Sequence, residues 1–259
     1  MLDSLYIGAS GMQAQQQNVD AISNNLANVN TAGYKRSRID FEDLLYRAVP
    51  SGRDSSGQFA ATGRMGMGTA MAGSSKVFTV GDAKKTAEPL DLAINGQGFF
   101  EIALPDGSVA YTRNGAFRLD QDGMLVNQDG YALVGAIQVP PESTQVRIDS
   151  VGRVTATLTG QRDPVELGQI HLANFTNPAG LTAVGDNLFQ ATDRAGEPII
   201  GNPGENGTGG LAQGYLEGSN VRLIDEMVSL ILAQRAYEIN AKVVQASDEL
   251  LSISNNLYR

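Results

Sequence analysis

The residue types that usually carry out chemistry are scarce in this chain of 259 residues. His171 is the only histidine and cysteine is absent, so a metal site lacks its commonest nitrogen and sulfur ligands. A hydrolase needs a nucleophile with a base, a tuned carboxylate pair or a metal, and each leaves a recognisable cluster of residues. No such cluster accompanies His171 in the sequence. We therefore predict a structural role for this histidine, no metal or cofactor, and no enzymatic activity.

Acidic side chains offer one alternative chemistry. Two carboxylates held at a suitable separation hydrolyse glycosidic bonds. The candidates for such a pair are Asp82, Asp91, Glu101, Asp120 and Asp122. A secreted carbohydrate-active enzyme with a β-domain is therefore the alternative function from a different class.

Two short runs, Asp120–Gly123 and Asn127–Gly130, resemble the start of a calcium-binding loop. Neither continues to the remaining ligands of an EF-hand, and neither belongs to a nonapeptide calcium-binding repeat. An Asp-Gly pair is also typical of a hairpin turn, because glycine adopts the positive φ that such a turn requires. We interpret both runs as turns.

The charge of the chain restricts its partners. A formal net charge of −9 disfavours nucleic acid and anionic membranes, which both require a positive surface. The only basic cluster, at residues 35–38, is followed at once by acidic residues at 40–43, so we interpret it as a local ion-pair patch. No stretch approaches the about 18 apolar residues of a membrane span. The first residues also lack the features of a cleavable secretory signal, which predicts a cytosolic protein or export by another route.

The middle of the sequence predicts antiparallel β-structure. Five Asx-Gly pairs follow one another at intervals of eleven, eight, eight and seven residues, with short strand-like runs between them. The pairs begin at Asn95, Asp106, Asn114, Asp122 and Asp129. A distorted barrel or a sandwich is the expected arrangement.

Both ends of the chain carry heptad patterns that predict long helices paired in a coiled coil. The C-terminal helix is expected over residues 221–258 and would be roughly 55 Å long at about 1.5 Å per residue. A helix of that length needs a partner along its length, and packing on the body of a globular protein is the competing interpretation. The patterns select the following packing residues: Leu5, Met12, Val19, Ile22, Leu26, Val29, Leu223, Leu230, Tyr237, Val244 and Leu251.

A glycine-rich stretch, residues 50–75, separates the first helix from the β-structure and predicts a linker or a loop ordered by its neighbours. Residues 34–46 are expected to be extended and then to turn into a short helical piece. Five of the glycines in the stretch are Gly52, Gly57, Gly63, Gly66 and Gly68. The resulting α+β division is a terminal helical domain (1–33 and 219–259), an extended linker (34–75) and a central β-domain (76–218).

Four motifs spread over the chain resemble one protein family. The segment 22–35, ISNNLANVNTAGYK, resembles the N-terminal signature of the flagellar axial proteins, the rod and hook family of bacteria. NGQGFF at 95–100 resembles the β-domain motif of its larger members, and QRAYEIN at 234–240 resembles the C-terminal helix of a rod member. YTRNG at 111–115 completes the set. Within the family, a sister rod protein and a hook-type protein are the alternatives to the rod protein that the motifs favour.

The resemblance implies a structural subunit of a helical, tubular polymer that transmits torque and encloses an export channel. It implies terminal helices along the inner wall and β-domains outside. The implied neighbours are proximal rod proteins, the hook protein, the peptidoglycan and outer-membrane rings, and the flagellar type III export apparatus. It also implies a place in the basal body, in a rod that spans the periplasm, and a role of the glycine-rich linker in stiffness.

Overall fold

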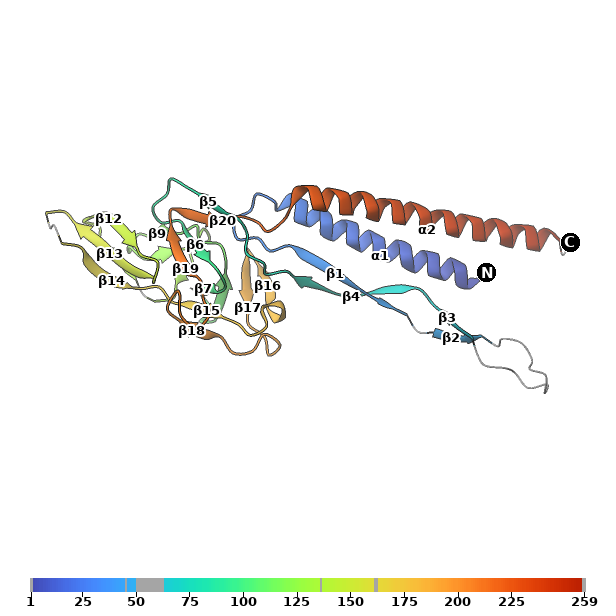
Figure 1. Ribbon diagram of the computed structural model, residues 1–259, viewed down its shortest axis with the longest axis horizontal. Coiled ribbons are helices and arrows are strands. Elements are labelled where there is room, and N and C mark those ends of the chain that lie inside the picture. The colour runs from blue at the N-terminus through green and yellow to red at the C-terminus, as the bar shows by residue number, and fades with distance from the viewer. Residues whose placement is uncertain (1, 45, 50–62, 136, 161–162, 258–259) are drawn as a thin grey trace. The chain divides into compact units, whose positions relative to one another are not determined.

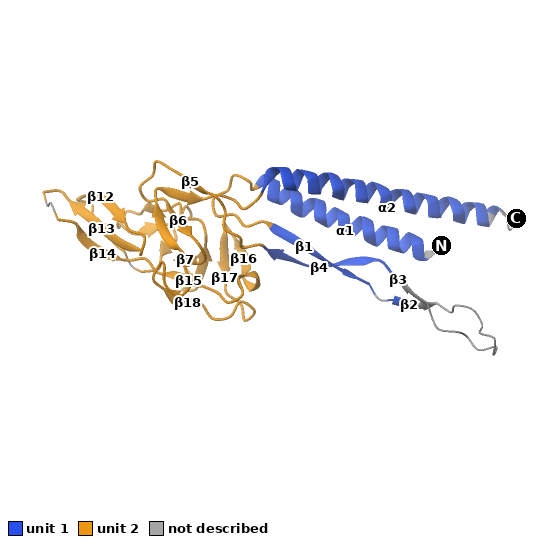
Figure 2. Cartoon of the chain, viewed as in Figure 1, with its two compact units in different colours: residues 1–27, 37–76, 222–259 blue, residues 28–36, 77–221 orange. Residues whose placement is uncertain are grey.

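The computed structural model describes residues 2–44, 46–49, 63–135, 137–160 and 163–257. The chain is α+β, with two α-helices and mostly antiparallel sheets in the described residues, as expected (Figure 1). It forms two compact units (Figure 2). Unit 1 contains residues 1–27, 37–76 and 222–259, and unit 2 contains residues 28–36 and 77–221.

Two antiparallel helices, α1 (Leu2–Ala27) and α2 (Leu223–Leu257), lie side by side in unit 1 (Figure 2). Gly8, near the start of α1, lies against Val244 in the C-terminal half of α2. Asn25, near the end of α1, reaches Glu226 in the first turn of α2, so the two helices run in opposite directions. The C-terminal helix agrees with its predicted range. The N-terminal helix ends before Val29, although that residue was selected as part of its apolar row.

Unit 1 also contains β-ribbons, and α1 contacts the first of them. Strands β1 (Ser37–Asp43) and β4 (Thr69–Lys76) pair antiparallel, and β2 (Tyr46–Val49) pairs with β3 (Gly63–Gly66). The expected short helical piece near Tyr46 is therefore wrong, because the chain stays extended there. Part of the expected linker, residues 69–75, is strand β4. Gly52 and Gly57 lie outside the described residues.

Unit 2 is built from antiparallel strands in several sheets. Its largest sheet has nine strands, and β15 and β18 branch from its main path. In spatial order the path is β16 (Thr182–Gly185), β17 (Leu188–Gln190), β8 (Val109–Thr112), β7 (Phe99–Ala103), β11 (Ala132–Leu133), β10 (Leu125–Val126) and β9 (Arg118–Leu119). The branch is β15 (Leu172–Asn174), which pairs with β7 and with β18 (Ile199–Gly201).

Smaller sheets complete unit 2. The remaining strands are β5 (Ala83–Lys85) with β20 (Tyr215–Glu217), β6 (Leu92–Asn95) with β19 (Gly210–Gln213), and the three-stranded sheet β12 (Ser143–Ile148), β13 (Arg153–Leu158) and β14 (Val165–Gln169). A 3-10 helix, η1, spans Pro178–Gly180. In the described residues the nine-stranded sheet does not close, and β16 and β9 lie at the ends of its seven-strand path. Of the two predicted arrangements, a distorted barrel or a sandwich, the barrel is therefore wrong.

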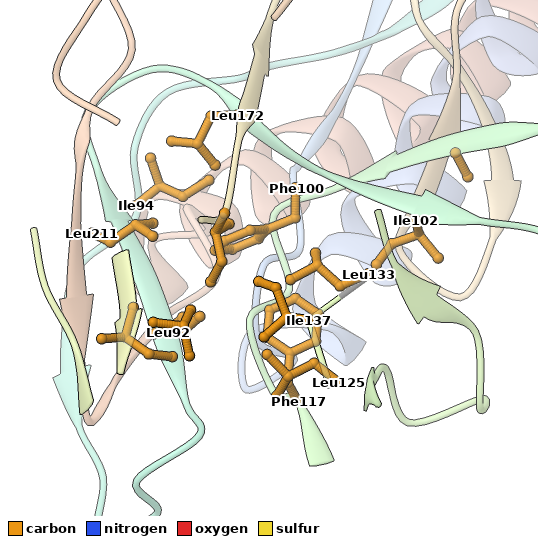
Figure 3. Packing of buried hydrophobic residues seen from close by; sticks show 14 of the residues in the cluster. Leu92, Ile94, Phe100, Ile102, Phe117, Leu125, Leu133, Ile137, Leu172 and Leu211 are labelled. Atoms are coloured by element: carbon orange, nitrogen blue, oxygen red, sulfur yellow. The ribbon is translucent and has the colours of Figure 1, made fainter. Parts of the chain in front are cut away.

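Strand β7 is buried on both faces, which explains why four of its five residues are apolar, with Glu101 as the exception. Successive side chains of a strand point to opposite faces. Accordingly, Phe100 and Ile102 join the main core, while Phe99 joins a second, aromatic-rich cluster with Phe175 and Phe189. Figure 3 shows the main core, to which the sheet and the small strand pairs both contribute. The NGQGFF motif therefore encodes the centre of unit 2.

The predicted turns are largely confirmed. In four of the five Asx-Gly pairs the glycine has a positive φ, from 75° at Gly123 to 136° at Gly96. Gly115 is the exception, and a different constraint requires glycine there. A Cβ built on Gly115 would lie 1.7 Å from the backbone oxygen of Leu92, so no larger residue fits beside that strand.

Candidate functional site

The most prominent surface feature of unit 1 is the apolar side of α2. Ile224, Leu232 and Ile239 are 74%, 64% and 60% exposed, far more than apolar side chains in a core. The large apolar residues of α2 that are exposed are Leu223, Ile224, Met227, Val228, Ile231, Leu232, Tyr237, Ile239, Val243, Leu250 and Ile253. Exposed apolar side chains gathered on one helix in this number are typical of a surface that another protein covers. We call these residues the α2 apolar surface.

The predicted packing rows are divided between the helix contact and this surface. Ile22 is buried, whereas Leu223 and Tyr237 belong to the α2 apolar surface. The half-buried members are Leu5, Met12, Val19, Leu26, Val29, Leu230, Val244 and Leu251. The structure thus buries or half-buries nine of the eleven predicted packing residues and leaves Leu223 and Tyr237 exposed.

Small residues make the contact between α1 and α2 close. Gly8, Gly11 and Ala14 of α1 are buried, as are Ala233 and Ser247 of α2. A Cβ added at Gly11 would lie 2.7 Å from the side-chain nitrogen of Asn240. Because the contact uses small residues, the large apolar side chains of α2 are left to face outward. Gly8, three residues after Leu5 on the same side of the helix, is therefore part of the packing.

A buried amide connects three elements of unit 1. Asn25 of α1 accepts a hydrogen bond from the Ser37 backbone N–H at 2.8 Å and donates one to the Ser37 carbonyl at 2.9 Å. Its amide nitrogen also lies 3.3 Å from the Glu226 carboxylate of α2. Asn25 and Glu226 are 2% and 5% exposed. One side chain thereby fixes α1 to β1 and to α2.

Unit 2 contains a buried cluster that we call the ion triad: Lys35, Arg113 and Glu217. The Lys35 Nζ lies 2.5 Å from Glu217 Oε1, and Arg113 Nη1 lies 3.1 Å from Glu217 Oε2. Their side chains are at most 2% exposed. Arg113 also donates to the Gly96 carbonyl at 2.8 Å and stacks over Phe99, 5.3 Å from the ring centroid. Two cations therefore share one carboxylate in a nearly dry site.

Burial dominates the electrostatics of the triad. Desolvation lowers the pKa of Lys35, and the Glu217 carboxylate acts in the opposite direction. Desolvation also lowers the pKa of Arg113, again opposed by Glu217. The Nε of Arg113 is buried and has no hydrogen-bond partner in the structure. Removal of Glu217 would take the shared carboxylate away from two buried cations, which is costly in protein interiors.

Sequence reasoning missed this triad. Arg38 and Asp40 do form the expected exposed local pair, at 2.9 Å. Lys35 does not belong to that patch, because it is buried and its partner lies 182 residues later in the chain. The sequence offers a sign of two members only, because Lys35 lies in the motif GYK and Arg113 in the motif YTRNG, whereas Glu217 lies in none of the four motifs. Spacing in the sequence does not reveal a pair of this separation.

The candidate carboxylates of the alternative enzyme lie on different elements. Glu101 is on β7 and Asp91 precedes β6, both buried, while Asp120 and Asp122 occupy the turn after β9. Those last two line a hollow of about 410 Å³ whose walls include Pro89, Pro140 and Pro141. His171 is exposed between β14 and β15. Neither described helix has a segment long and apolar enough to cross a membrane.

Comparisons with known proteins agree with the motifs. Three family models match the chain: "Flagella basal body rod protein" at residues 5–35, "Flagellar hook protein FlgE/F/G D1 domain" at 93–156, and "Flagellar basal body rod FlgEFG protein C-terminal" at 212–257. The first match ends at Lys35, the second contains Arg113, and the third contains Glu217.

Full-length relatives are also found. The chain is 46% identical to the flagellar basal-body rod protein FlgG of Buchnera aphidicola subsp. Schizaphis graminum, over 97% of this chain and 98% of that protein. It is 45% identical to FlgG of Borreliella burgdorferi over the whole of both chains. The flagellar basal-body rod protein FlgF of Caulobacter vibrioides is 32% identical, over 96% of this chain and 95% of that protein.

Proposed function

Because this chain belongs to the family of the flagellar basal-body rod proteins, we propose that the α2 apolar surface is where successive subunits of the rod pack on one another. The chain is a structural subunit of the flagellar axis and not an enzyme. The identities of 45–46% to FlgG proteins, against 32% to a FlgF protein, support the distal rod over the sister rod protein.

The observation that carries the packing proposal is the exposure of α2. Its partner within the subunit, α1, contacts it through small residues and leaves large apolar side chains uncovered. Burial of apolar surface contributes about 25 cal/mol per Å², so repeated contacts along a helix of this length favour association strongly. We propose that α1 and α2 form a coiled coil whose outer faces meet the same helices of neighbouring subunits in a tubular polymer.

Assembly into a rod determines which flagellar proteins the subunit contacts and where in the flagellum it lies. The protein assembles within the flagellar basal body with other rod and hook components. We propose that it contacts proximal rod proteins on one side and the hook protein on the other, and that the rings surround it as the rod crosses the periplasm. We propose export through the flagellar type III apparatus and transmission of torque along the finished rod.

Tyr237→Asp tests the packing surface. Tyr237 is 40% exposed, so a charge there should leave the subunit folded. Once neighbouring subunits cover it, an unpaired carboxylate would be desolvated, at a cost of several kcal/mol per buried charge. We expect a soluble protein with the parent circular dichroism spectrum and no rods by electron microscopy or sedimentation.

Gln128→Asp is the matched control, because it adds the same charge at an exposed polar position of unit 2, outside the α2 apolar surface. It should assemble as the parent does. Normal rods from Tyr237→Asp, or a collapsed β-sheet spectrum in that variant, would contradict the proposed role of the surface.

A further inference from the structure

We propose that residues 28–36 and 215–221 of unit 2 form one cooperative closure, in which neither segment stays docked without the other. The first segment follows α1 in the chain and the second precedes α2. Both belong to unit 2, and the ion triad is their centre. We call this pair of segments the closure.

Backbone hydrogen bonds join the two segments directly. The Gly33 N–H donates to the Glu217 carbonyl at 2.8 Å, and the Arg36 N–H donates to the Asn220 side-chain oxygen, also at 2.8 Å. In return, the Asn220 N–H donates to the Tyr34 carbonyl at 3.4 Å. Each segment therefore satisfies backbone groups of the other, and these groups would lose their partners if either segment left.

A third stretch, residues 77–82, receives both segments. Lys35 donates to the Thr79 carbonyl at 2.7 Å, and the Asn220 amide donates to the Val77 carbonyl at 2.6 Å. The Gly81 N–H donates to the Glu217 carboxylate at 2.8 Å. Because residues 77–82 bond to both segments, undocking of one segment exposes to water some of the groups that hydrogen-bond to the other.

The charges of the ion triad make the two segments depend on each other more strongly than their hydrogen bonds alone would. Glu217 arrives from one segment, Lys35 from the other and Arg113 from the body of unit 2. If the segment that carries Glu217 undocks, Lys35 and Arg113 are left as two buried cations that repel each other without the Glu217 carboxylate between them. The Lys35 ammonium then has a lower free energy in water than in the buried site, so the segment that carries Lys35 undocks as well.

The closure can open while the nine-stranded sheet remains folded, because neither of its segments contributes a strand to that sheet. No strand is assigned in residues 28–36, and the strand of the second segment, β20, pairs with β5 in a separate two-stranded sheet. Local opening of such a unit, below the free energy of global unfolding, is common in folded proteins. Glu217 also lies 182 residues after Lys35, so the closure forms only when nearly all of unit 2 is present.

Hydrogen exchange of the full-length subunit tests the coupling. In Glu217→Gln, the Gly33 and Arg36 amides should exchange roughly 100-fold faster than in the parent, because breaking a buried ion pair on one side is strongly destabilising. Glu197→Gln removes the same charge from an exposed position and should leave both amides unchanged. Amides of β7, Phe99–Ala103, report on the body of unit 2.

The reciprocal variant is Lys35→Met, which leaves a neutral Glu217–Arg113 pair. It should speed exchange of the Gly218 amide, whose acceptor is the Asp82 carbonyl, by roughly tenfold, although the substitution lies in the other segment. Asn220→Ala, which changes no charge, should speed exchange at Gly33, whose own acceptor, the Glu217 carbonyl, the substitution leaves in place.

Protected Gly33 and Arg36 amides in a folded Glu217→Gln protein would overturn the proposal. If Glu217→Gln does not fold, the other two variants decide. Faster exchange at the closure with β7 still protected supports coupling. An equal rise at β7, or an effect confined to the substituted segment, overturns it.

Discussion

At the scale of single residues, burial rather than chemistry explains the unusual side chains. Glu101 on β7 is 5% exposed, and burial raises its pKa above the ordinary value of 4.5, while the charge of His171 opposes the shift. The neighbouring Tyr111, paired with Glu101 across the β7–β8 register, has a raised pKa because of burial and then because of Glu101. A carboxylate in this position opposes folding when it is charged.

Glu101→Gln should therefore stabilise the protein in a pH-dependent manner. Since the folded-state pKa is raised, the folded protein holds the proton to higher pH than the unfolded chain, and the contribution of Glu101 is fully present below about pH 4.5. That contribution is lost as pH rises through the folded pKa. The melting temperature of the variant should exceed that of the parent at about pH 7, and the difference should shrink towards about pH 4.

Glu142→Gln, at an exposed carboxylate, is the control and should show no such trend. An equal increase in melting temperature at both pH values would mean that Glu101→Gln does not stabilise the protein by removing a buried charge.

Gly115→Ala should be among the most destabilising single-methyl additions in unit 2. The Cβ would meet the Leu92 oxygen, a backbone atom that cannot turn aside, so we expect a loss at or above the roughly 3 kcal/mol upper end for overpacking. Gly107→Ala is the comparison, because it has φ of 84° but nothing within 4 Å of the added methyl. It should cost only about 1 kcal/mol from the left-handed backbone. Chemical denaturation measures both, and equal losses would contradict the role assigned to the close approach.

At the scale of elements, the sequence predicts what depends on local pattern. The heptads predict both helices to within a few residues, and Asx-Gly pairs predict the turns because glycine is needed locally for positive φ. The ribbon of β1 and β4 is not predictable in this way. Strand β4 is made mostly of small residues, and its extended form depends on pairing with β1 and contact with α1, which composition does not encode.

The contact between α1 and α2 gives an element-scale prediction. Alanine is favoured over glycine in a helix by about 1 kcal/mol, so Gly8→Ala would stabilise an isolated helix. Here the added methyl would lie 2.7 Å from the Val244 side chain. We expect Gly8→Ala to lower the temperature at which helical circular dichroism is lost, and Val244→Ala to restore it in the double variant. Ser4→Ala, at an exposed position of α1, is the control. A higher melting temperature for Gly8→Ala alone would contradict close packing at this point.

At the scale of the whole molecule, the candidate site divides into a predictable and an unpredictable part. The rows that contain Tyr237 and Leu223 are visible as periodic apolar positions. The triad and the contact between Asn25 and Glu226 are not, because their partners come from segments more than 100 residues apart, 201 in the case of Asn25 and Glu226.

The glycine-rich stretch supports a prediction about the assembled rod. We propose that the linker glycines, Gly52, Gly57, Gly63, Gly66 and Gly68, set stiffness once neighbouring subunits clamp the stretch. Deletion of residues 52–68 should still allow polymers, because α1 and α2 remain, but the shafts should be curved or pliable in electron micrographs. Straight shafts with unchanged bending stiffness would contradict this role.

The outward-facing side chains of α2 also have a consequence for mutational tolerance. In the subunit they contribute little to folding, so a scan that selects for solubility or thermal stability should accept nearly any residue at Ile224, Leu232 or Ile239, and favour polar ones. A scan of the same library that selects for swimming should reject those variants. The two tolerance maps should be nearly complementary along α2 and should coincide at the core of unit 2, so that the difference between them outlines the interface without a structure of the assembled rod.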